Sequence, residues 1–193
     1  CTACRPGKFK SQSGDFECSD CGPATYSSAV GATSPSTCSR CPDLSFSPVG
    51  SSSLSQCECK PGSSGPNGGT CTICDAGKFK EIPGASACVS CGAGKFSTSS
   101  QAESESVCFA CPAHSHSQPA STSRSACKCN AGAFGGDGGP CSECLAGKFK
   151  TGAGEADCSN CGPGKYSTLS GAISESACMV CPSNADSLAA SSS

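Results

Sequence analysis

Cysteine is the residue type whose number and spacing in this sequence point to chemistry. The chain has 22 cysteines among 193 residues, and most of them stand in Cys-x-x-Cys pairs such as Cys1 and Cys4. Closely spaced thiols either oxidise to disulfides or bind zinc as thiolates. A cysteine content above about 10% predicts a disulfide scaffold, and it places the chain in an oxidising compartment.

Zinc is the alternative use of these thiols. The first four cysteines, within residues 1–21, have a spacing near that of four-cysteine zinc modules. The pair Cys57-x-Cys59 does not fit such a module, and the loops are rich in serine and glycine. We therefore expect disulfides, no metal ion and no cofactor. A free-thiol assay on denatured protein separates the two possibilities.

The cysteine positions repeat every 70 residues. Eight positions of residues 1–70 recur in 71–140, and six of them recur again in 141–193. The sequence thus predicts two complete cysteine-rich repeats and a partial third, as a segment of a longer array. Because surface loops change length at little cost, constant loop lengths favour units that stack regularly. A recent duplication is the alternative explanation.

Each repeat contains four loops that begin and end in cysteine, and spacing alone does not fix their pairing. We favour sequential pairing, which leaves Cys1 and Cys181 to pair with residues beyond the segment. The alternative is crossed pairing, in which Cys1 bonds Cys18 and Cys4 bonds Cys21. The sequential pairs are Cys4–Cys18, Cys21–Cys38, Cys41–Cys57, Cys59–Cys71, Cys74–Cys88, Cys91–Cys108, Cys111–Cys127, Cys129–Cys141, Cys144–Cys158 and Cys161–Cys178.

The composition also predicts the fold class. Aromatic residues make up 5% of the chain, with one Met and no Trp, so large apolar side chains are too few for a conventional core. Each disulfide loop contributes about 3 kcal/mol in the chain-entropy model. Gly7 before Lys8-Phe9 predicts a turn into a short strand, and Gly14 the return turn. We therefore predict a small disulfide-rich fold: tandem cysteine-rich modules of short β-hairpins and loops, stacked into an elongated rod, with little or no helix.

The sequence offers no set of residues suited to catalysis or calcium binding. His114 and His116 are the only histidines, and Leu44 and Phe46 stand at the same places in the first copy, so we expect solvated loop residues. A catalytic site needs a nucleophile, a base and an orienting group held together, and no such set recurs. Asp137 lies alone among glycines, whereas calcium needs several clustered oxygen ligands. We therefore expect no enzyme.

Charge and hydropathy limit the partners. The net charge is −2 with a pI near 5.6 and no basic patch, which argues against nucleic acid. No apolar run approaches 18 residues, so we expect no membrane contact by this segment. Lys8 and Lys10 recur in every copy, either to contact acidic polysaccharide or a neighbouring chain, or as solvated lysines beside a packed aromatic ring. We expect an extracellular or cell-surface location through the secretory pathway.

Loops rich in serine and threonine offer acceptors for O-glycans, whereas no Asn-x-Ser/Thr sequence exists for N-glycans. Such glycans would shield a protein with little apolar packing, and unmodified flexible loops are the alternative. The candidate acceptors are Thr33, Ser34, Ser36, Thr37, Ser117, Ser121, Thr122 and Ser123.

Several residues of the first copy carry a resemblance to a known family. Cys18-Ser-Asp-Cys21-Gly22, Tyr26, the run 31–34 and Cys38-x-x-Cys41-Pro42 resemble the cysteine-rich module of ephrin receptors. That module is related to growth-factor-receptor and tumour-necrosis-factor-receptor modules. Cys57-x-Cys59 with its following Gly62 and Cys71 also resembles the last hairpin of an epidermal-growth-factor-like domain.

The resemblance implies a spacer or an interaction surface in an extracellular protein. An uninterrupted array of one module differs from receptor ectodomains, where modules alternate with other folds. We therefore expect a non-enzymatic structural protein, a disulfide-stapled rod that forms or decorates a cell-surface filament or matrix. Its partners would be copies of itself or other extracellular or surface proteins, with glycans as a further candidate. The alternative is the ligand-binding or spacer stalk of a receptor or adhesion ectodomain.

Overall fold

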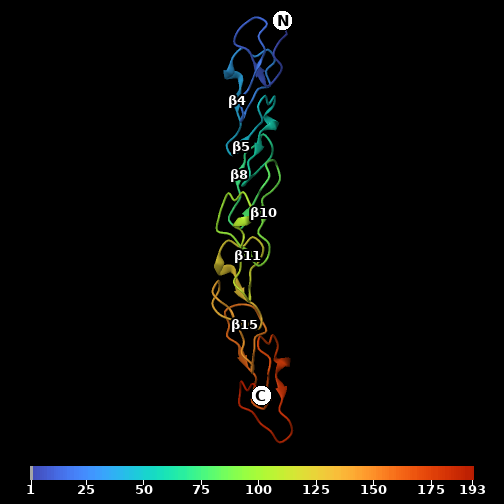
Figure 1. The fold of residues 1–193 in the computed structure, drawn as a ribbon, viewed down its shortest axis with the longest axis vertical. Coiled ribbons are helices and arrows are strands. Elements are labelled where there is room, and N and C mark those ends of the chain that lie inside the picture. Colours follow the sequence, from blue (N-terminus) through green and yellow to red (C-terminus); the bar gives the residue numbers. More distant parts are fainter. Residues whose placement is uncertain (1) are drawn as a thin grey trace. The chain divides into compact units, whose positions relative to one another are not determined.

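The structure, a computed structural model, describes residues 2–193 and contains no α-helix there. Its regular elements are ten two-stranded sheets, each made of strands of two residues, and five short 3₁₀ turns (Figure 1). The predicted small disulfide-rich fold with short hairpins is therefore confirmed.

The same order of elements recurs along the chain. The first 70 residues hold β1 (Lys8–Phe9), β2 (Ser19–Asp20), β3 (Thr25–Tyr26), η1 (Pro35–Thr37), β4 (Ser39–Arg40), β5 (Ser45–Phe46), η2 (Leu54–Gln56), β6 (Glu58–Cys59) and β7 (Ser63–Ser64). The next 70 hold β8 (Thr72–Ile73), β9 (Lys78–Phe79), β10 (Val89–Ser90), β11 (Lys95–Phe96), η3 (Glu105–Val107), β12 (Phe109–Ala110), β13 (Ser115–His116), η4 (Arg124–Ala126), β14 (Lys128–Cys129) and β15 (Ala133–Phe134). The remainder holds β16 (Ser142–Glu143), β17 (Lys148–Phe149), β18 (Ser159–Asn160), β19 (Lys165–Tyr166), η5 (Glu175–Ala177) and β20 (Met179–Val180).

A tight turn leads into each hairpin and sets its register. In the first, the N–H of Lys8 donates to the carbonyl of Arg5 (3.1 Å), with Pro6 and Gly7 between them. Gly7 has φ +82°, the left-handed conformation that the third position of a type II turn requires. The Lys8–Phe9 strand then pairs antiparallel with β2, and Phe9 lies opposite Ser19. The predicted turn into a short strand is confirmed.

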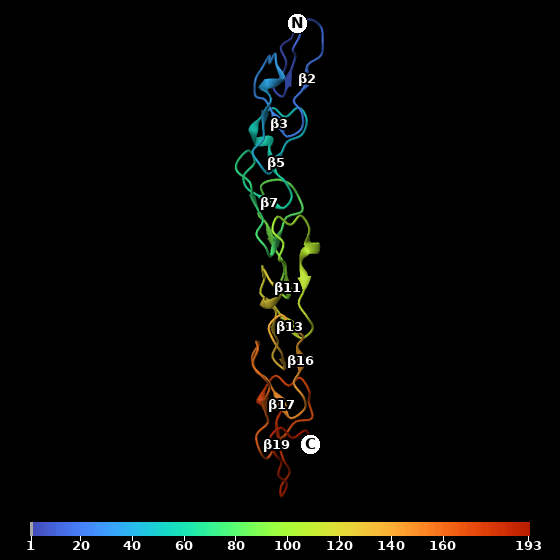
Figure 2. The same ribbon diagram turned by 90° about the vertical axis from the view of Figure 1, so that its left-hand side faces the viewer.

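The described chain forms two compact units by its internal contacts. One comprises Cys1–Val89 with Ser99–Val107, and the other Ser90–Thr98 with Cys108–Ser193. Within each unit the hairpins follow one another in chain order (Figure 2). This division does not fall at the ends of the 70-residue repeats, so the three predicted repeats remain a description of the sequence.

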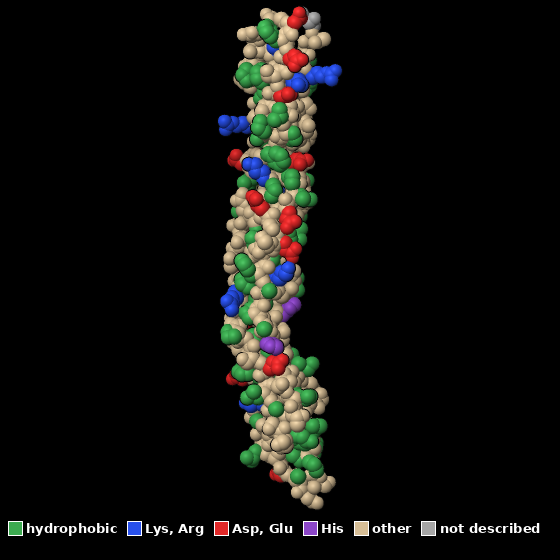
Figure 3. Space-filling model, in the orientation of Figure 1, with side chains coloured by type: hydrophobic (Ala, Val, Ile, Leu, Met, Phe, Trp, Pro, Cys, Tyr) green, Lys and Arg blue, Asp and Glu red, His purple; other side chains and the backbone are tan. Residues whose placement is uncertain are grey.

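Half-cystines and serines fill the interior instead of large apolar side chains. Among the described residues the buried set comprises thirteen cysteines, eight serines that include Ser47 and Ser63, four alanines, Phe79 and the lysines Lys80 and Lys150. Acidic and basic side chains are interspersed on the face drawn in Figure 3, and neither unit gathers one sign of charge there. The disulfides and the backbone hydrogen bonds must therefore supply most of the cohesion.

Candidate functional site: the junctions between hairpins

The cysteines of residues 2–193 are paired in sequence order. The ten disulfides are Cys4–Cys18, Cys21–Cys38, Cys41–Cys57, Cys59–Cys71, Cys74–Cys88, Cys91–Cys108, Cys111–Cys127, Cys129–Cys141, Cys144–Cys158 and Cys161–Cys178. These are the pairs of the sequential scheme and not those of the crossed one. Cys181 is the only free cysteine in the described part, and Cys1 lies outside it.

One type of backbone hydrogen bond recurs between successive hairpins. Among residues 2–193, ten N–H groups donate to the carbonyl of a half-cystine in the preceding hairpin, over 2.7–3.0 Å. The donors are Gly31, Gly50, Gly68, Gly84, Gln101, Ala120, Gly138, Gly154, Gly171 and Ala190, and their acceptors, in the same order, are Cys4, Cys21, Cys57, Cys59, Cys74, Cys91, Cys127, Cys129, Cys144 and Cys161. All ten donors have positive φ. The contact therefore depends on a left-handed residue presenting its N–H to the neighbouring hairpin.

Three of these donors are not glycines, and sequence reasoning missed them. Gln101, Ala120 and Ala190 have φ of 53°, 60° and 64°. A left-handed conformation costs an L-residue about 1–2 kcal/mol, and the recurring hydrogen bond offsets part of it. The glycines of the other copies at the same places, Gly31 and Gly50, were the available signal.

The junction between a fourth loop and the first loop of the next copy also carries a pair of backbone bonds that recurs at other junctions. In the first unit the N–H of Gly62 donates to the Lys80 carbonyl (2.9 Å), and the N–H of Cys74 donates to the Gly62 carbonyl (2.8 Å). A Cβ on Gly62 would lie 2.5 Å from the Gln101 carbonyl oxygen, so this close approach requires glycine. Gly132 makes the same contacts in the second unit.

A buried lysine completes each of these two junctions. The Lys80 ammonium donates to the Ser63 carbonyl (2.8 Å) across the junction and to the Gly84 carbonyl on its own hairpin. The Lys150 ammonium bonds the carbonyls of Ala133 (2.7 Å) and Gly154 in the same way. Lys80 is 2% exposed and Lys150 is 5% exposed. Lys80 and Lys150 are therefore not solvated, which corrects, for these two lysines, one of the two interpretations made from the sequence.

Burial has an electrostatic consequence for Lys80. Desolvation lowers the pKa of its ammonium, and the Glu58 carboxylate opposes this shift by favouring the charged form. The two carbonyl acceptors replace the water that the ammonium loses.

Lys10 occupies the same position in the first copy, and no fourth-loop hairpin precedes it in the described residues. Its ammonium donates instead to the carbonyls of Gly14 (2.7 Å) and Phe16 (3.3 Å) on its own hairpin, and it is partly exposed. Lys8, the other recurring lysine, pairs with Asp20 (2.8 Å) at the surface. The recurring lysines thus have two roles that the sequence did not separate.

Buried serines link the second and third loops of the first two copies. The Ser47 hydroxyl donates to the Thr25 carbonyl (2.9 Å), and the Ser117 hydroxyl donates to the Lys95 carbonyl (2.8 Å). Ser117 is 2% exposed. A glycan on its hydroxyl would break this bond and could not be accommodated, so Ser117 is removed from the candidate acceptors.

The other candidate acceptors lie nearer the surface. Thr33, Ser36 and Thr122 are exposed, whereas Ser34, Thr37, Ser121 and Ser123 are half-buried. Their modification remains a prediction.

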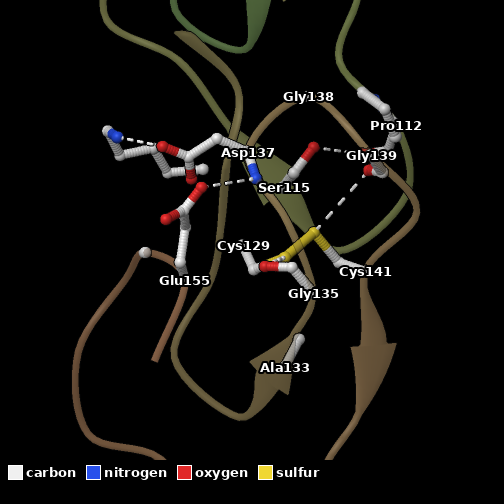
Figure 4. The surroundings of a disulfide bond; sticks show 12 residues. Pro112, Ser115, Cys129, Ala133, Gly135, Asp137, Gly138, Gly139, Cys141 and Glu155 are labelled. Atoms are coloured by element: carbon white, nitrogen blue, oxygen red, sulfur yellow. Dashed lines mark hydrogen bonds and ion pairs between the residues drawn. A yellow bond between two sulfur atoms is a disulfide. The ribbon is translucent and has the colours of Figure 1, made fainter. Parts of the chain in front are cut away.

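A charged group lies beside one fourth-loop disulfide, Cys129–Cys141 (Figure 4). Lys128 pairs with Asp137, and this hydrogen bond raises the pKa of the lysine. The N–H of Asp137 donates to a Glu155 carboxylate oxygen (3.3 Å) on the next hairpin. The bond to Glu155 ties the fourth loop to the following first loop, as the bond from Lys150 to Ala133 does.

The alternative sites considered from the sequence do not assemble in the described residues. Cys4, Cys18 and Cys21 of the hypothetical zinc set are in disulfides. No group of three or more His, Cys, Asp or Glu side chains within 2–193 is arranged to hold a metal ion. His114 Nδ1 lies 3.7 Å from a Glu143 carboxylate oxygen at the surface. The same part of the chain has no helix with the length and apolarity to cross a membrane.

These features define a class of protein, a tandem array of small disulfide-stapled modules. The family described as tyrosine-protein kinase ephrin type A/B receptor-like matches residues 1–38 and 132–185. These parts of the chain are ephrin-receptor-like cysteine-rich repeats, and the resemblance predicted from the sequence is confirmed there. No curated protein matches the chain. Repeats of this kind, together with the many disulfides, indicate an extracellular domain.

Proposed function

We propose that the chain is a non-enzymatic extracellular structural protein, a disulfide-stapled rod that forms or decorates a cell-surface filament or matrix. The observation that carries the proposal is the junction between hairpins. The same left-handed donor bonds a half-cystine carbonyl ten times among residues 2–193. When each unit contacts only its neighbours in the same way, the units add up to an extended array.

The interior supports a mechanical role more than a binding role. Pairs of half-cystines and hydrogen-bonded serines take the place of a packed apolar core. Covalent links close every hairpin of the described chain, so pulling on its ends loads disulfides and backbone hydrogen bonds together. The partners in this proposal are copies of the chain or other surface proteins, with glycans on exposed loops such as that of Thr33.

Small-angle scattering of the oxidised chain tests the shape on which this proposal depends. A compact globule of 193 residues has a radius of gyration of about 16 Å. We expect a value well above that, with an intensity that falls as 1/q over a range of angles, as for a rod. The chain reduced and alkylated under denaturing conditions is the control for an expanded coil. A value near that of a globule would overturn the rod.

A second candidate is the ligand-binding or spacer stalk of a receptor or adhesion ectodomain. The match to a receptor-like family favours it. The full-length gene and electron micrographs discriminate between the two. A membrane-spanning segment with a different domain beside the array supports the stalk, whereas helical polymers whose repeat is commensurate with the 70-residue unit support the filament.

A further inference from the structure

The first loop has one face that is covered in the second and third copies and uncovered in the first. In the second copy the fourth-loop hairpin of Cys59–Cys71 lies on this face, and in the third copy the hairpin of Cys129–Cys141 does. Among the described residues nothing of that kind lies on the equivalent face of the first copy, which Lys10 and Gly14 form.

Four hydrogen bonds hold the covering hairpin, and they are the same in both copies. In the second copy the Lys80 ammonium donates to the Ser63 carbonyl, and the Gly84 N–H donates to the Cys59 carbonyl. The Gly62 N–H donates to the Lys80 carbonyl, and the Gly62 carbonyl accepts from the Cys74 N–H. In the third copy the Lys150 ammonium donates to the Ala133 carbonyl. The N–H groups of Gly154, Gly132 and Cys144 donate to the carbonyls of Cys129, Lys150 and Gly132, in that order.

The first copy carries the groups needed for these four bonds. Cys4 and Gly14 supply the two N–H donors, and Lys10 supplies both the carbonyl and the ammonium. Gly14 has the same left-handed conformation (φ +133°) as Gly84 (+112°), although within 2–193 no half-cystine carbonyl of a preceding hairpin accepts its N–H. The Lys10 ammonium stays on its own hairpin, at Gly14 and Phe16.

The surface around these groups is open and partly apolar. An open cavity of about 440 Å³ is lined by Lys10, Gly14 and Phe16, among others. The Phe16 side chain is 64% exposed, whereas serine and alanine stand at its place in the other copies.

From this comparison we infer that the face formed by Cys4, Lys10, Gly14 and Phe16 is a docking surface for a fourth-loop hairpin of the same repeat type. This inference rests on the proposed array, because docking at this face is the contact by which the array would be extended. Docking turns the Lys10 ammonium from the Phe16 carbonyl to a carbonyl of the incoming hairpin, as Lys80 does with Ser63. The N–H of Gly14 then donates to the first half-cystine of that hairpin.

A graft tests the inference on the whole chain. Residues 58–70 are copied in front of Cys1, which stands 70 residues before Cys71, so the copied cysteine and Cys1 can close the loop as Cys59 and Cys71 do. We expect hydrogen exchange at the Gly14 amide to slow by about tenfold or more, towards the rates of Gly84 and Gly154 in the same sample. Amine-reactive reagents should label Lys10 less.

The matched control is the same graft with Ala in place of its copy of Gly62. A Cβ at this place meets a backbone oxygen in both existing junctions, that of Gln101 or that of Gly171, so this graft should leave Gly14 exchange unchanged. The inference is overturned if the glycine graft leaves Gly14 and Lys10 as they are, or if its two cysteines do not pair. Either result leaves the scattering test of the rod untouched, so the two proposals fail separately.

Discussion

Lys80 and Lys10 occupy the same position in two copies of one repeat, and they have different environments. The Lys80 ammonium is buried and bonds a carbonyl of the preceding hairpin, whereas the Lys10 ammonium is partly exposed and, within residues 2–193, donates to carbonyls of its own hairpin. Their local sequences are nearly the same, Gly-Lys-Phe-Lys in both. The difference therefore comes from the neighbouring hairpin, which teaches that burial here is a property of the junction and not of the module.

The largest effect on the difference between Lys80 and Lys10 is expected from opening the disulfide of the hairpin that covers Lys80. Replacing Cys59 and Cys71 together by serine removes a disulfide worth about 3 kcal/mol in the chain-entropy model. We expect faster hydrogen exchange at Gly84 and labelling of Lys80 by amine reagents to the extent seen for Lys10.

The control opens a disulfide elsewhere. Serine at both Cys161 and Cys178 removes an equivalent link in the other unit, and it should leave Lys80 protected. If Lys80 remains unreactive in the Cys59–Cys71 variant as well, the disulfide is not what holds the covering hairpin in place.

The next largest effect is expected from Gly62→Ala. Gly62 has φ +73°, and the added Cβ would lie 2.5 Å from the Gln101 carbonyl oxygen. Backbone strain and this collision together should destabilise the junction by about 2 kcal/mol or more, measured as faster exchange of the Cys74 and Gly84 amides. Gly22→Ala is the control, because nothing lies within 4 Å of its added Cβ. Equal effects from the two variants would contradict the close approach.

Removal of the ammonium itself should have a smaller effect. Lys80→Met keeps the stem of the side chain but leaves the carbonyls of Ser63 and Gly84 without their donor, at a cost of about 1–3 kcal/mol. Lys10→Met should change stability by less than about 0.5 kcal/mol, since water can reach the carbonyls it leaves. Denaturant unfolding followed by circular dichroism compares the two. Equal losses of unfolding free energy in the two variants would mean that the covering hairpin of Cys59–Cys71 does not change what the lysine contributes.

Much of the fold could be predicted from the sequence because cysteine spacing limits what the chain can do. Sequence separations of 12 to 17 between paired half-cystines leave room for little more than a short hairpin. Gly7 and Gly14 marked turns, since their positive φ values suit glycine. The interior of serine and half-cystine follows from the lack of large apolar residues.

The junctions could not be predicted in the same way. The donors Gln101, Ala120 and Ala190 carry no glycine signal, because the neighbouring hairpin imposes their left-handed conformation. From the sequence of one copy alone, a lysine is expected to be solvated. Lys80 is buried because its ammonium donates to the carbonyl of Ser63, 17 residues earlier in the preceding hairpin. The sequence likewise predicts an accessible hydroxyl at Ser117, because it does not show that this hydroxyl donates to the carbonyl of Lys95, 22 residues earlier.

The smallest expected effect concerns pH and sharpens the comparison through the pKa of Lys80. Burial lowers that pKa below the ordinary lysine value of 10.5, so in the window between the lowered value and 10.5 the unfolded chain binds more protons than the folded one. The cost of desolvating the ammonium is fully present below this window and is relieved as the pH rises through it. Stability contributed by Lys80 should therefore increase on going from pH 8 towards 10.5.

The measurement is the difference in unfolding free energy between the natural chain and Lys80→Met across that range, because most other titrations cancel in the difference. The free thiol of Cys181 is alkylated first to prevent disulfide exchange. We expect the difference to move in favour of the natural chain with rising pH. A difference that stays flat or moves the other way would mean that the Lys80 ammonium remains hydrated in the folded chain. The contrast between the two lysines would then rest on their hydrogen bonds alone.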